Sequence, residues 1–131
     1  MTAKVLFTSK THNTAGPEGA AVSADGFLDI KLAQPHPAAE NLFGAAWSAC
    51  YMGALGVAAA QKKIALPADV AVDAEIDLSL VNGGYELSAR LNVSLPGLER
   101  DVAQALIEAA HTICPYSKAV DGNIDVQTTL A

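Results

Sequence analysis

Residues 70–95 carry the most regular alternation of apolar and polar side chains in the chain. Apolar residues occupy every second position over 70–80, and the alternation resumes over 85–95 after the turn sequence NGG. A period of two predicts strands with one apolar face, and an Asn-Gly turn between two such strands predicts a hairpin. We therefore expect a long antiparallel hairpin with one apolar face that other elements must cover.

A first helix is expected from Pro37 to Lys63. Pro37 suits the first helical turn, and Glu40 lies near the positive N-terminal end of the helix. The segment is hydrophobic nearly all round, so we expect it to be buried on most sides. A single domain of this size has difficulty burying such a helix alone, which favours a second subunit.

A second helix is expected after residue 97. Apolar side chains recur there at the three-to-four spacing of one buried stripe: Val102, Ala105, Leu106, Ala109 and Ile113. The helix should end at Cys114, because Pro115 disfavours helical conformation in the residue before it.

The remaining strands are expected over 4–10, 20–23, 27–32 and 123–130, with glycine-containing turns between them. The order of three strands, a helix, a hairpin, a helix and a final strand is an α+β pattern. We predict antiparallel sheets with a long buried central helix and a second helix, in a single domain spanning residues 1–131.

Composition and charge restrict the possible partners. The chain has 51% hydrophobic but only 5% aromatic residues, which predicts a core of small aliphatic side chains. The net charge of -6 and the absence of a basic cluster argue against nucleic acid as a partner. The sequence has neither the apolar run of a signal peptide nor an uninterrupted apolar run long enough to cross a membrane. We expect a soluble, cytoplasmic protein without a membrane partner.

The two cysteines are Cys50, in the middle of the first helix, and Cys114, at the end of the second. In a reducing cytosol such a pair is either two buried spectators or a redox pair, and the residues alone leave both interpretations open. A reactive Cys50 would need a hydrogen-bond donor or a cation from another element, because mid-helix positions receive no help from the helix dipole. His111 is placed either to pair with Cys114 or simply to meet the dipole at the helix end.

Other ready-made signals are weak. His12, His36 and His111 lack the spacing of zinc ligands, so no metal is expected. The glycines of GPEG and NGG read as turns rather than phosphate-binding loops, and no Gly-x-Ser-x-Gly nucleophile motif is present. No cofactor is predicted.

Three segments resemble one known family: SADGFLDIKL (23–32), ENLFGAAWSACYMGAL (40–55) and CPYSKAVDGNIDV (114–126). They are similar to the OsmC/Ohr family of organic hydroperoxide resistance proteins, and the last segment favours the Ohr branch. The resemblance implies a cysteine peroxidase in which Cys50 attacks the hydroperoxide and becomes a sulfenic acid. It implies that Cys114 then forms a disulfide with Cys50, and that lipoyl groups on proteins, or another dithiol reductant, restore the thiols. It also implies an intertwined homodimer with its sites at the subunit interface.

Glu40 matches a family carboxylate that orients an arginine beside the reactive cysteine. Glu40 and Cys50 are separated by about 15 Å of helix, so Glu40 should act through that arginine or from the facing subunit. The loop in which the arginine is expected reads TAGPEG here, with Pro17 in its place. The candidate cations to take the place of this arginine are Lys10, His12, Arg90 and Arg100.

The leading hypothesis is a thiol-dependent peroxidase for bulky, apolar organic hydroperoxides. An apolar mouth would be lined by Phe43, Trp47, Met52 and Tyr116, although each of these is equally well explained as ordinary core. Loss of the arginine favours two alternatives. One is a protein of the same fold that binds an apolar ligand, and the other is a redox sensor without efficient turnover.

Overall fold

The structure is a computed structural model that describes residues 2–35 and 38–131. It divides into two compact units, residues 1–38 (unit 1) and 39–131 (unit 2). The expected helix start at Pro37, and His36, lie outside the described residues.

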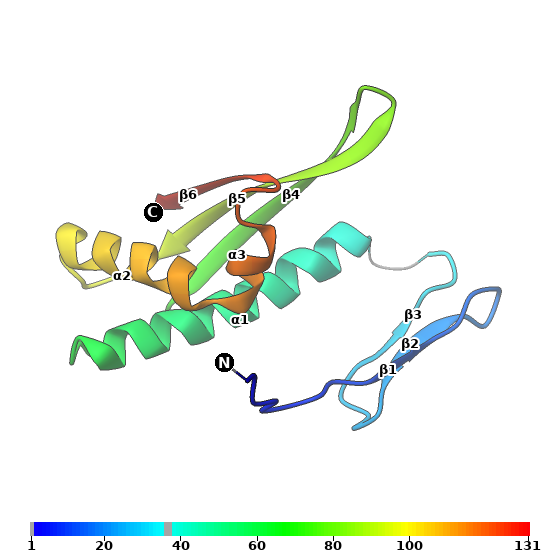
Figure 1. Cartoon of the computed structure of the whole chain (residues 1–131), viewed down its shortest axis with the longest axis horizontal. Coiled ribbons are helices and arrows are strands. Elements are labelled where there is room, and N and C mark those ends of the chain that lie inside the picture. The colour runs from blue at the N-terminus through cyan, green and yellow to red at the C-terminus, as the bar shows by residue number, and fades with distance from the viewer. Residues whose placement is uncertain (1, 36–37) are drawn as a thin grey trace. The chain divides into compact units, whose positions relative to one another are not determined.

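Unit 1 is a small antiparallel sheet. Its strands are β1 (Thr11–Asn13), β2 (Ala20–Ser23) and β3 (Asp29–Lys31), in the order β1-β2-β3 (Figure 1). The prediction of a strand over 20–23 is confirmed, and the strand expected over 27–32 is shorter than predicted.

The strand expected over 4–10 is wrong. Thr11 is the first residue of β1 and pairs with Ser23, the last residue of β2. Residues before Thr11 therefore have no strand beside them, apart from one bond in which the Ala24 N–H donates to the Lys10 carbonyl. An apolar segment does not become a strand without a neighbouring edge to pair with.

Unit 2 contains the predicted hairpin. Strands β4 (Ala71–Val81) and β5 (Gly84–Ser94) are antiparallel along their whole length. Asn82 and Gly83 connect them with positive φ values of 51° and 81°. Two consecutive residues of this kind give the turn whose twist matches that of the strands.

The last strand corrects the prediction that all pairing is antiparallel. Strand β6 (Asp125–Leu130) pairs with β5 in parallel, so the sheet β4-β5-β6 is mixed. The chain between β5 and β6 contains two helices, and a crossover of this length is what parallel neighbours require.

The helices of unit 2 are α1 (Ala39–Gln61), α2 (Arg100–Ile113) and α3 (Pro115–Val120), and they lie on one face of the sheet (Figure 1). The second helix ends before Cys114 as predicted, but Pro115 also begins α3, which the sequence reading missed. The buried stripe of α2 is rotated from the expected one. It consists of Ala103, Leu106, Ile107 and Ala110, whereas Ala105 is exposed.

Helix α1 is buried along one of its sides, and not on most sides as the sequence had predicted. By length and composition α1 could cross a membrane, but eight of its residues are buried against the rest of unit 2, as in the core helix of a soluble protein. Its opposite side is exposed and made of small residues: Ala45, Ala46, Ala49, Gly53, Val57 and Ala60.

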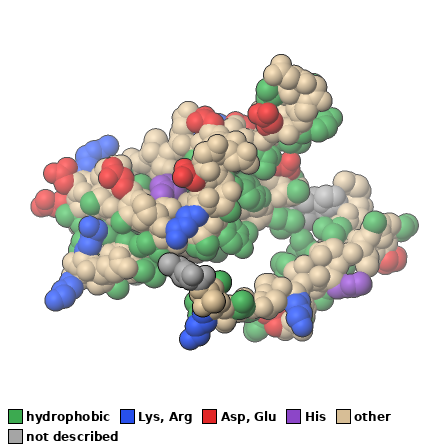
Figure 2. All heavy atoms as spheres, viewed as in Figure 1, with side chains coloured by type: hydrophobic (Ala, Val, Ile, Leu, Met, Phe, Trp, Pro, Cys, Tyr) green, Lys and Arg blue, Asp and Glu red, His purple; other side chains and the backbone are tan. Residues whose placement is uncertain are grey.

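The apolar face of the hairpin is covered only at its base. Val72, Ala74 and Ile76 pack against the core, whereas Leu80 and Tyr85 near the turn are 69% and 78% exposed. The hairpin tip extends beyond the helices in Figure 1, and Figure 2 shows hydrophobic side chains gathered at this tip. This apolar surface has no cover within unit 2.

Candidate active site

The structure brings the two cysteines together. The Sγ atoms of Cys50 and Cys114 lie 3.0 Å apart, and both thiols are free. Cys50 comes from the middle of α1, and Cys114 comes from the junction of α2 and α3. A disulfide has a sulfur–sulfur distance of about 2.05 Å, so the two atoms need to close by only about 1 Å to form one.

The two thiols differ in exposure. Cys50 is partly exposed, whereas the Cys114 side chain is completely buried. A molecule arriving from solvent therefore meets Cys50 first. Cys114 stands at the end of α2 as predicted, and it is enclosed and already in contact with Cys50.

The two thiols of the pair differ in acidity. Burial opposes ionisation of Cys114, but hydrogen bonds from Cys50, Ser117 and Tyr116 outweigh it and lower the pKa of the Cys114 thiol. Burial, and then the hydrogen bond to Cys114, raise the pKa of the Cys50 thiol. Cys114 is therefore the more acidic member of the pair in the isolated chain.

Cys114 also caps a helix. Its Sγ accepts a hydrogen bond from the Ser117 N–H at 3.5 Å, and Pro115 occupies the first turn of α3. The first N–H groups of a helix have no partner within the helix, so they are available to an electron-rich sulfur. The C-P-x-S sequence thus places a donor beside the thiol.

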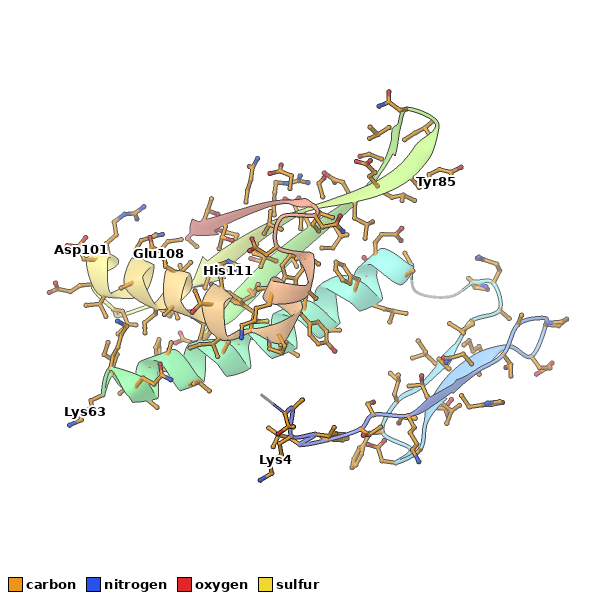
Figure 3. All side chains as sticks on the ribbon, viewed as in Figure 1. Lys4, Lys63, Tyr85, Asp101, Glu108 and His111 are labelled. Atoms are coloured by element: carbon orange, nitrogen blue, oxygen red, sulfur yellow. The ribbon has the colours of Figure 1, made fainter. Side chains whose placement is uncertain are left out.

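Three further side chains surround this cap. The Trp47 Nε1–H donates to Ser117 Oγ at 3.0 Å, and His111 Nδ1 lies 3.0 Å from the same oxygen. His111 Nε2 lies 2.8 Å from Thr128 Oγ1 on β6. Figure 3 shows His111 projecting from α2 on the side that faces β6. His111 therefore contacts Ser117, and of the two alternatives left open by the sequence the direct pair with Cys114 is not formed.

Tyr51 encloses the other side of His111. The two rings are 4.7 Å apart and tilted by 47°, and the Tyr51 hydroxyl donates to the Ile107 carbonyl at 2.9 Å. Burial lowers the pKa of His111, and Asp121 opposes that effect only in part. The imidazole is consequently neutral at pH 7.

Glu40 lies apart from the thiols in unit 2. It is in the first turn of α1 and lines a groove of about 350 Å³ together with Ser48 and Met52, against the base of β4. Neither cysteine lines this groove. Within the part of the chain that the structure describes, Glu40 has no ion pair.

Two of the four candidate cations are excluded as neighbours of Cys50 in its own chain. Arg90 lies on the sheet face opposite the core, with bonds of 2.7 and 3.0 Å to Asp77 and 3.0 Å to Glu75. Arg100 begins α2, whose other end carries Cys114 about 21 Å away at 1.5 Å per residue. Lys10 and His12 belong to unit 1 and stay candidates.

Of the four residues expected to line an apolar mouth, one does not do so. Trp47 is fully buried and hydrogen-bonded, so it belongs to the core rather than to an apolar mouth beside Cys50. Phe43 packs on it with ring centroids 5.5 Å apart, Met52 lines the groove beside Glu40, and Tyr116 is 45% exposed.

A hollow in unit 2 lies next to residues that surround Cys114. It measures about 510 Å³ and is lined by Trp47, His111, Ser117 and Thr128, among others, but by neither cysteine. It therefore borders the hydrogen-bond network around Ser117 rather than the reactive sulfur atoms. Among the described residues, no cluster of His, Cys, Asp and Glu side chains could hold a metal ion.

Comparison with known proteins agrees with this geometry. The model of the family described as "OsmC-like protein" matches residues 32–129. The organic hydroperoxide resistance protein of Xanthomonas axonopodis pv. citri is 40% identical over 98% of this chain and 96% of its own length. This chain belongs to the OsmC/Ohr family.

Solved structures give this OsmC/Ohr protein the same fold. The organic hydroperoxide resistance protein OhrB of Bacillus subtilis has a TM-score of 0.86 and 35% identity, covering 97% of this chain and all of that one. The organic hydroperoxide resistance protein of Elizabethkingia anophelis, with thiocyanate bound, has a TM-score of 0.89 and 34% identity, covering 98% and 99%. The α+β fold predicted from the sequence is confirmed.

Sequence reasoning missed the residues that surround Cys114 in this OsmC/Ohr protein. Ser117, Trp47, Tyr51 and Thr128 were assigned to no site, or only to an apolar mouth. Ser117 alone carried a signal, because a cysteine followed by proline and, at the third position, serine has the spacing of a helix cap. The other three come from distant elements, and only the fold brings them together.

Proposed function

We propose that this protein is a cysteine-based peroxidase that reduces organic hydroperoxides to alcohols. The observation that carries the proposal is the pair of free sulfur atoms 3.0 Å apart, of which only Cys50 is open to solvent. Membership of a family whose relatives are named for organic hydroperoxide resistance supports the choice of substrate.

The reaction has two steps within the chain. The Cys50 thiolate attacks the terminal oxygen of the hydroperoxide, the O–O bond breaks, and the alkoxide takes a proton to leave as an alcohol. Cys50 is then a sulfenic acid. The Cys114 thiolate attacks the Cys50 sulfur, the S–O bond breaks, and hydroxide leaves as water after taking a proton. The product is the Cys50–Cys114 disulfide.

The order of the roles follows from exposure. A bulky hydroperoxide reaches the partly exposed Cys50, whereas the enclosed Cys114 touches only Cys50 and its own donors. The opposite order would require the hydroperoxide to enter a site without solvent access.

The first step needs a cation near Cys50, because the pKa of this thiol is raised in the isolated chain. Glu40 has no ion pair in the described residues, and the position of the family arginine holds Pro17. We propose that Glu40 is the carboxylate that orients this cation. The proposed catalytic set is Cys50, Cys114 and Glu40, together with that cation.

The proposed assembly is a cytoplasmic homodimer. The exposed side of α1 is made of small residues that allow another helix to approach closely, and the apolar hairpin tip lacks cover. Unit 1 also carries apolar side chains with no cover inside that unit, among them Phe7 and Phe27. A second copy would cover these surfaces.

A lipoyl protein or another dithiol would return the disulfide to thiols by exchange.

The proposal is tested by treating the reduced protein with one equivalent of an aromatic or fatty-acid hydroperoxide. Free thiols and intact mass are then measured within seconds. We expect two thiols per chain to disappear together with two hydrogen atoms. Cys50→Ser should abolish the reaction, whereas Cys114→Ser should be oxidised once and proceed to sulfinic acid. Unchanged peroxide consumption by Cys50→Ser contradicts the mechanism.

Two other functions are separated by the same experiment, and Pro17 is the observation that favours them. A redox sensor forms the disulfide once but does not turn over with a dithiol reductant. A protein that binds an apolar ligand keeps both thiols after exposure to the hydroperoxide.

A further inference from the structure

Two contacts join α1 to the segment that carries Cys114. Cys50 Sγ lies 3.0 Å from Cys114 Sγ. Three residues before Cys50 on α1, the Trp47 Nε1–H donates to Ser117 Oγ at 3.0 Å. Ser117 follows Cys114 by three residues, and its N–H donates to Cys114 Sγ at 3.5 Å. Figure 1 shows α3 beside α1, so the sulfur pair and the Trp47–Ser117 bond are two neighbouring links between α1 and the beginning of α3.

Cys114 is the hinge between α2 and α3. Its φ of -64° and ψ of 117° are extended rather than helical, and this one residue separates the two helices. The Cys114 N–H donates to the Ala110 carbonyl of α2 at 2.8 Å, and its carbonyl accepts from the Lys118 N–H of α3 at 3.1 Å. The direction in which the Cys114 side chain points therefore depends on how α3 is held.

Helix α3 does not hold its position alone. It has six residues, and a helix this short is unstable without packing against other elements. Its buried residue is Ser117, whereas Tyr116, Lys118 and Ala119 are exposed. The Trp47–Ser117 bond therefore holds the buried side of α3 against α1.

The Trp47–Ser117 bond lies in the core and has a fixed direction. Both residues are buried, so water does not compete for the bond. The indole nitrogen is a donor only, so Trp47 donates whatever the protonation of the neighbouring groups. Opening the bond leaves a buried N–H without a partner, which is costly.

We propose that Trp47 is a positioning residue, whose bond to Ser117 keeps the two cysteine sulfurs together and so favours their disulfide. The inference deepens the proposed peroxidase function and rests on it for the role of the disulfide in catalysis. Two groups held together react as if at a high effective concentration, because they are already ordered before the reaction. A protein without the bond must order α3 again each time the disulfide forms. Trp47 acts through Ser117, since its indole N–H is bound there.

The disulfide equilibrium measures this effect without a hydroperoxide. In a mixture of oxidised and reduced dithiothreitol, the Cys50 thiolate attacks the disulfide of the reagent, and the S–S bond of the reagent breaks. The Cys114 thiolate then attacks the Cys50 sulfur of the mixed disulfide and releases the reduced reagent. The protein loses two electrons and two protons, and the reagent gains them. The ratio of the reagent forms at which half of the protein is oxidised gives the equilibrium constant.

Two substitutions remove the bond from opposite ends. Trp47→Phe removes the indole N–H, and Ser117→Ala removes the hydroxyl but keeps the backbone N–H that binds Cys114. Ser117→Ala also loses the contact with His111, so the bond between Trp47 and Ser117 is what the two variants have in common. Leu55→Ala is the matched control, because it opens a cavity on the buried side of the same helix and removes no hydrogen bond.

We expect the equilibrium constant for disulfide formation to fall about tenfold in Trp47→Phe, which is the effect of about one buried hydrogen bond. The constant should fall by a similar factor in Ser117→Ala. In the double variant it should also fall about tenfold rather than about a hundredfold, because both substitutions remove the same bond. Leu55→Ala should be less stable and yet keep the wild-type constant within about twofold.

The constants of these variants decide the inference. A wild-type constant in folded Trp47→Phe overturns it, as does about a hundredfold fall in the double variant or an equal fall in Leu55→Ala. If Trp47→Phe does not fold, Ser117→Ala and Ser117→Thr decide, because only the threonine keeps a hydroxyl. A fall in Ser117→Ala alone then supports the inference, and any other result overturns it.

The same measurement separates the inference from the proposed function. If the wild-type forms the disulfide with dithiothreitol but does not consume the hydroperoxide, the proposed function fails, while the constants of the variants still decide the inference. If the wild-type forms no disulfide with either reagent, both fail.

Discussion

The indole N–H of Trp47 donates to Ser117 Oγ at 3.0 Å and joins α1 to α3 next to the thiol pair. Trp47 comes one helical turn before Cys50, and Ser117 comes one turn after Cys114. One hydrogen bond therefore joins a residue close in sequence to Cys50 and a residue close in sequence to Cys114. The bond fixes the distance between the two helices that carry the sulfur atoms.

Removing this bond should destabilise the fold. Trp47→Phe leaves the Ser117 hydroxyl without one donor and leaves space in the core, so we expect a loss of about 1 to 3 kcal/mol in the free energy of unfolding. Urea denaturation of Trp47→Phe, Ser117→Ala and the double variant measures the coupling between them. The double variant should be more stable than the sum of the single losses predicts. Strictly additive losses would show that the two side chains do not interact.

The acidities of the two thiols should depend on one another. Cys50→Ala removes a donor from Cys114, so the pKa of Cys114 should rise relative to its value in the pair. Cys114→Ala removes the sulfur that accepts from Cys50, so the pKa of Cys50 should fall. Thiolate absorbance in the ultraviolet, followed against pH in each variant, measures both values. Identical titrations in the variants and the wild-type would contradict a hydrogen bond between the two thiols.

The free energy of unfolding should decrease as the pH is lowered, because of His111. Its pKa is lower in the folded protein than the ordinary value of 6.5, so the unfolded chain binds more protons in the interval between the two. The contribution of the neutral imidazole to the free energy of unfolding is therefore fully present above about pH 6.5. It is lost as the pH falls toward the pKa that His111 has in the folded protein. Urea denaturation between pH 7 and pH 5 should show this slope, and His111→Asn should flatten it.

Arg90 should not take part in peroxide reduction. Its guanidinium is bound to Glu75 and Asp77 on the sheet face away from the cysteines. We expect Arg90→Gln to oxidise at the wild-type rate and to show only a small change in stability, because exposed ion pairs contribute little. A slow Arg90→Gln would place the missing cation on this face instead.

A bulky residue at Gly53 should separate the subunits. A Cβ atom at Gly53 meets nothing within 4 Å in its own chain, so the chain tolerates a larger side chain there. In a dimer that packs the small-residue side of α1 against its copy, Gly53→Leu keeps the helices apart. Sedimentation should show a dimer for the wild-type and for Glu108→Leu, an exposed position on α2, and a monomer for Gly53→Leu. A dimeric Gly53→Leu would place the interface elsewhere.

The sequence predicted those elements whose periodicity is long and whose ends carry turn or cap signals. The hairpin over 71–94 and the helix Ala39–Gln61 are of this kind. It did not predict α3, because six residues are too short for a period and Pro115 was interpreted as a stop. The strand expected over 4–10 was wrong since pairing depends on a neighbouring edge, which the local sequence does not encode.

The candidate site was predictable only in part. The cysteines were found through the resemblance of their surrounding segments to a family, while their spacing alone left open whether they meet. The position of Ser117 in the C-P-x-S sequence carried a signal for a helix cap, but this signal was missed. The contacts of Trp47 and Thr128 carried no such signal, because each is made between elements far apart in the chain and depends on how the helices pack.

The double position of Cys114, at the end of α2 and at the beginning of α3, ties the redox state to the shape of the surface. As a thiolate its sulfur is a strong acceptor for the first turn of α3. As half of the proposed disulfide it would be neutral and accept weakly, so we expect oxidation to loosen the short helix that carries Tyr116 and Lys118 on its exposed side. Under the proposed function, a dithiol reductant would then meet a different surface on an oxidised molecule than on a reduced one.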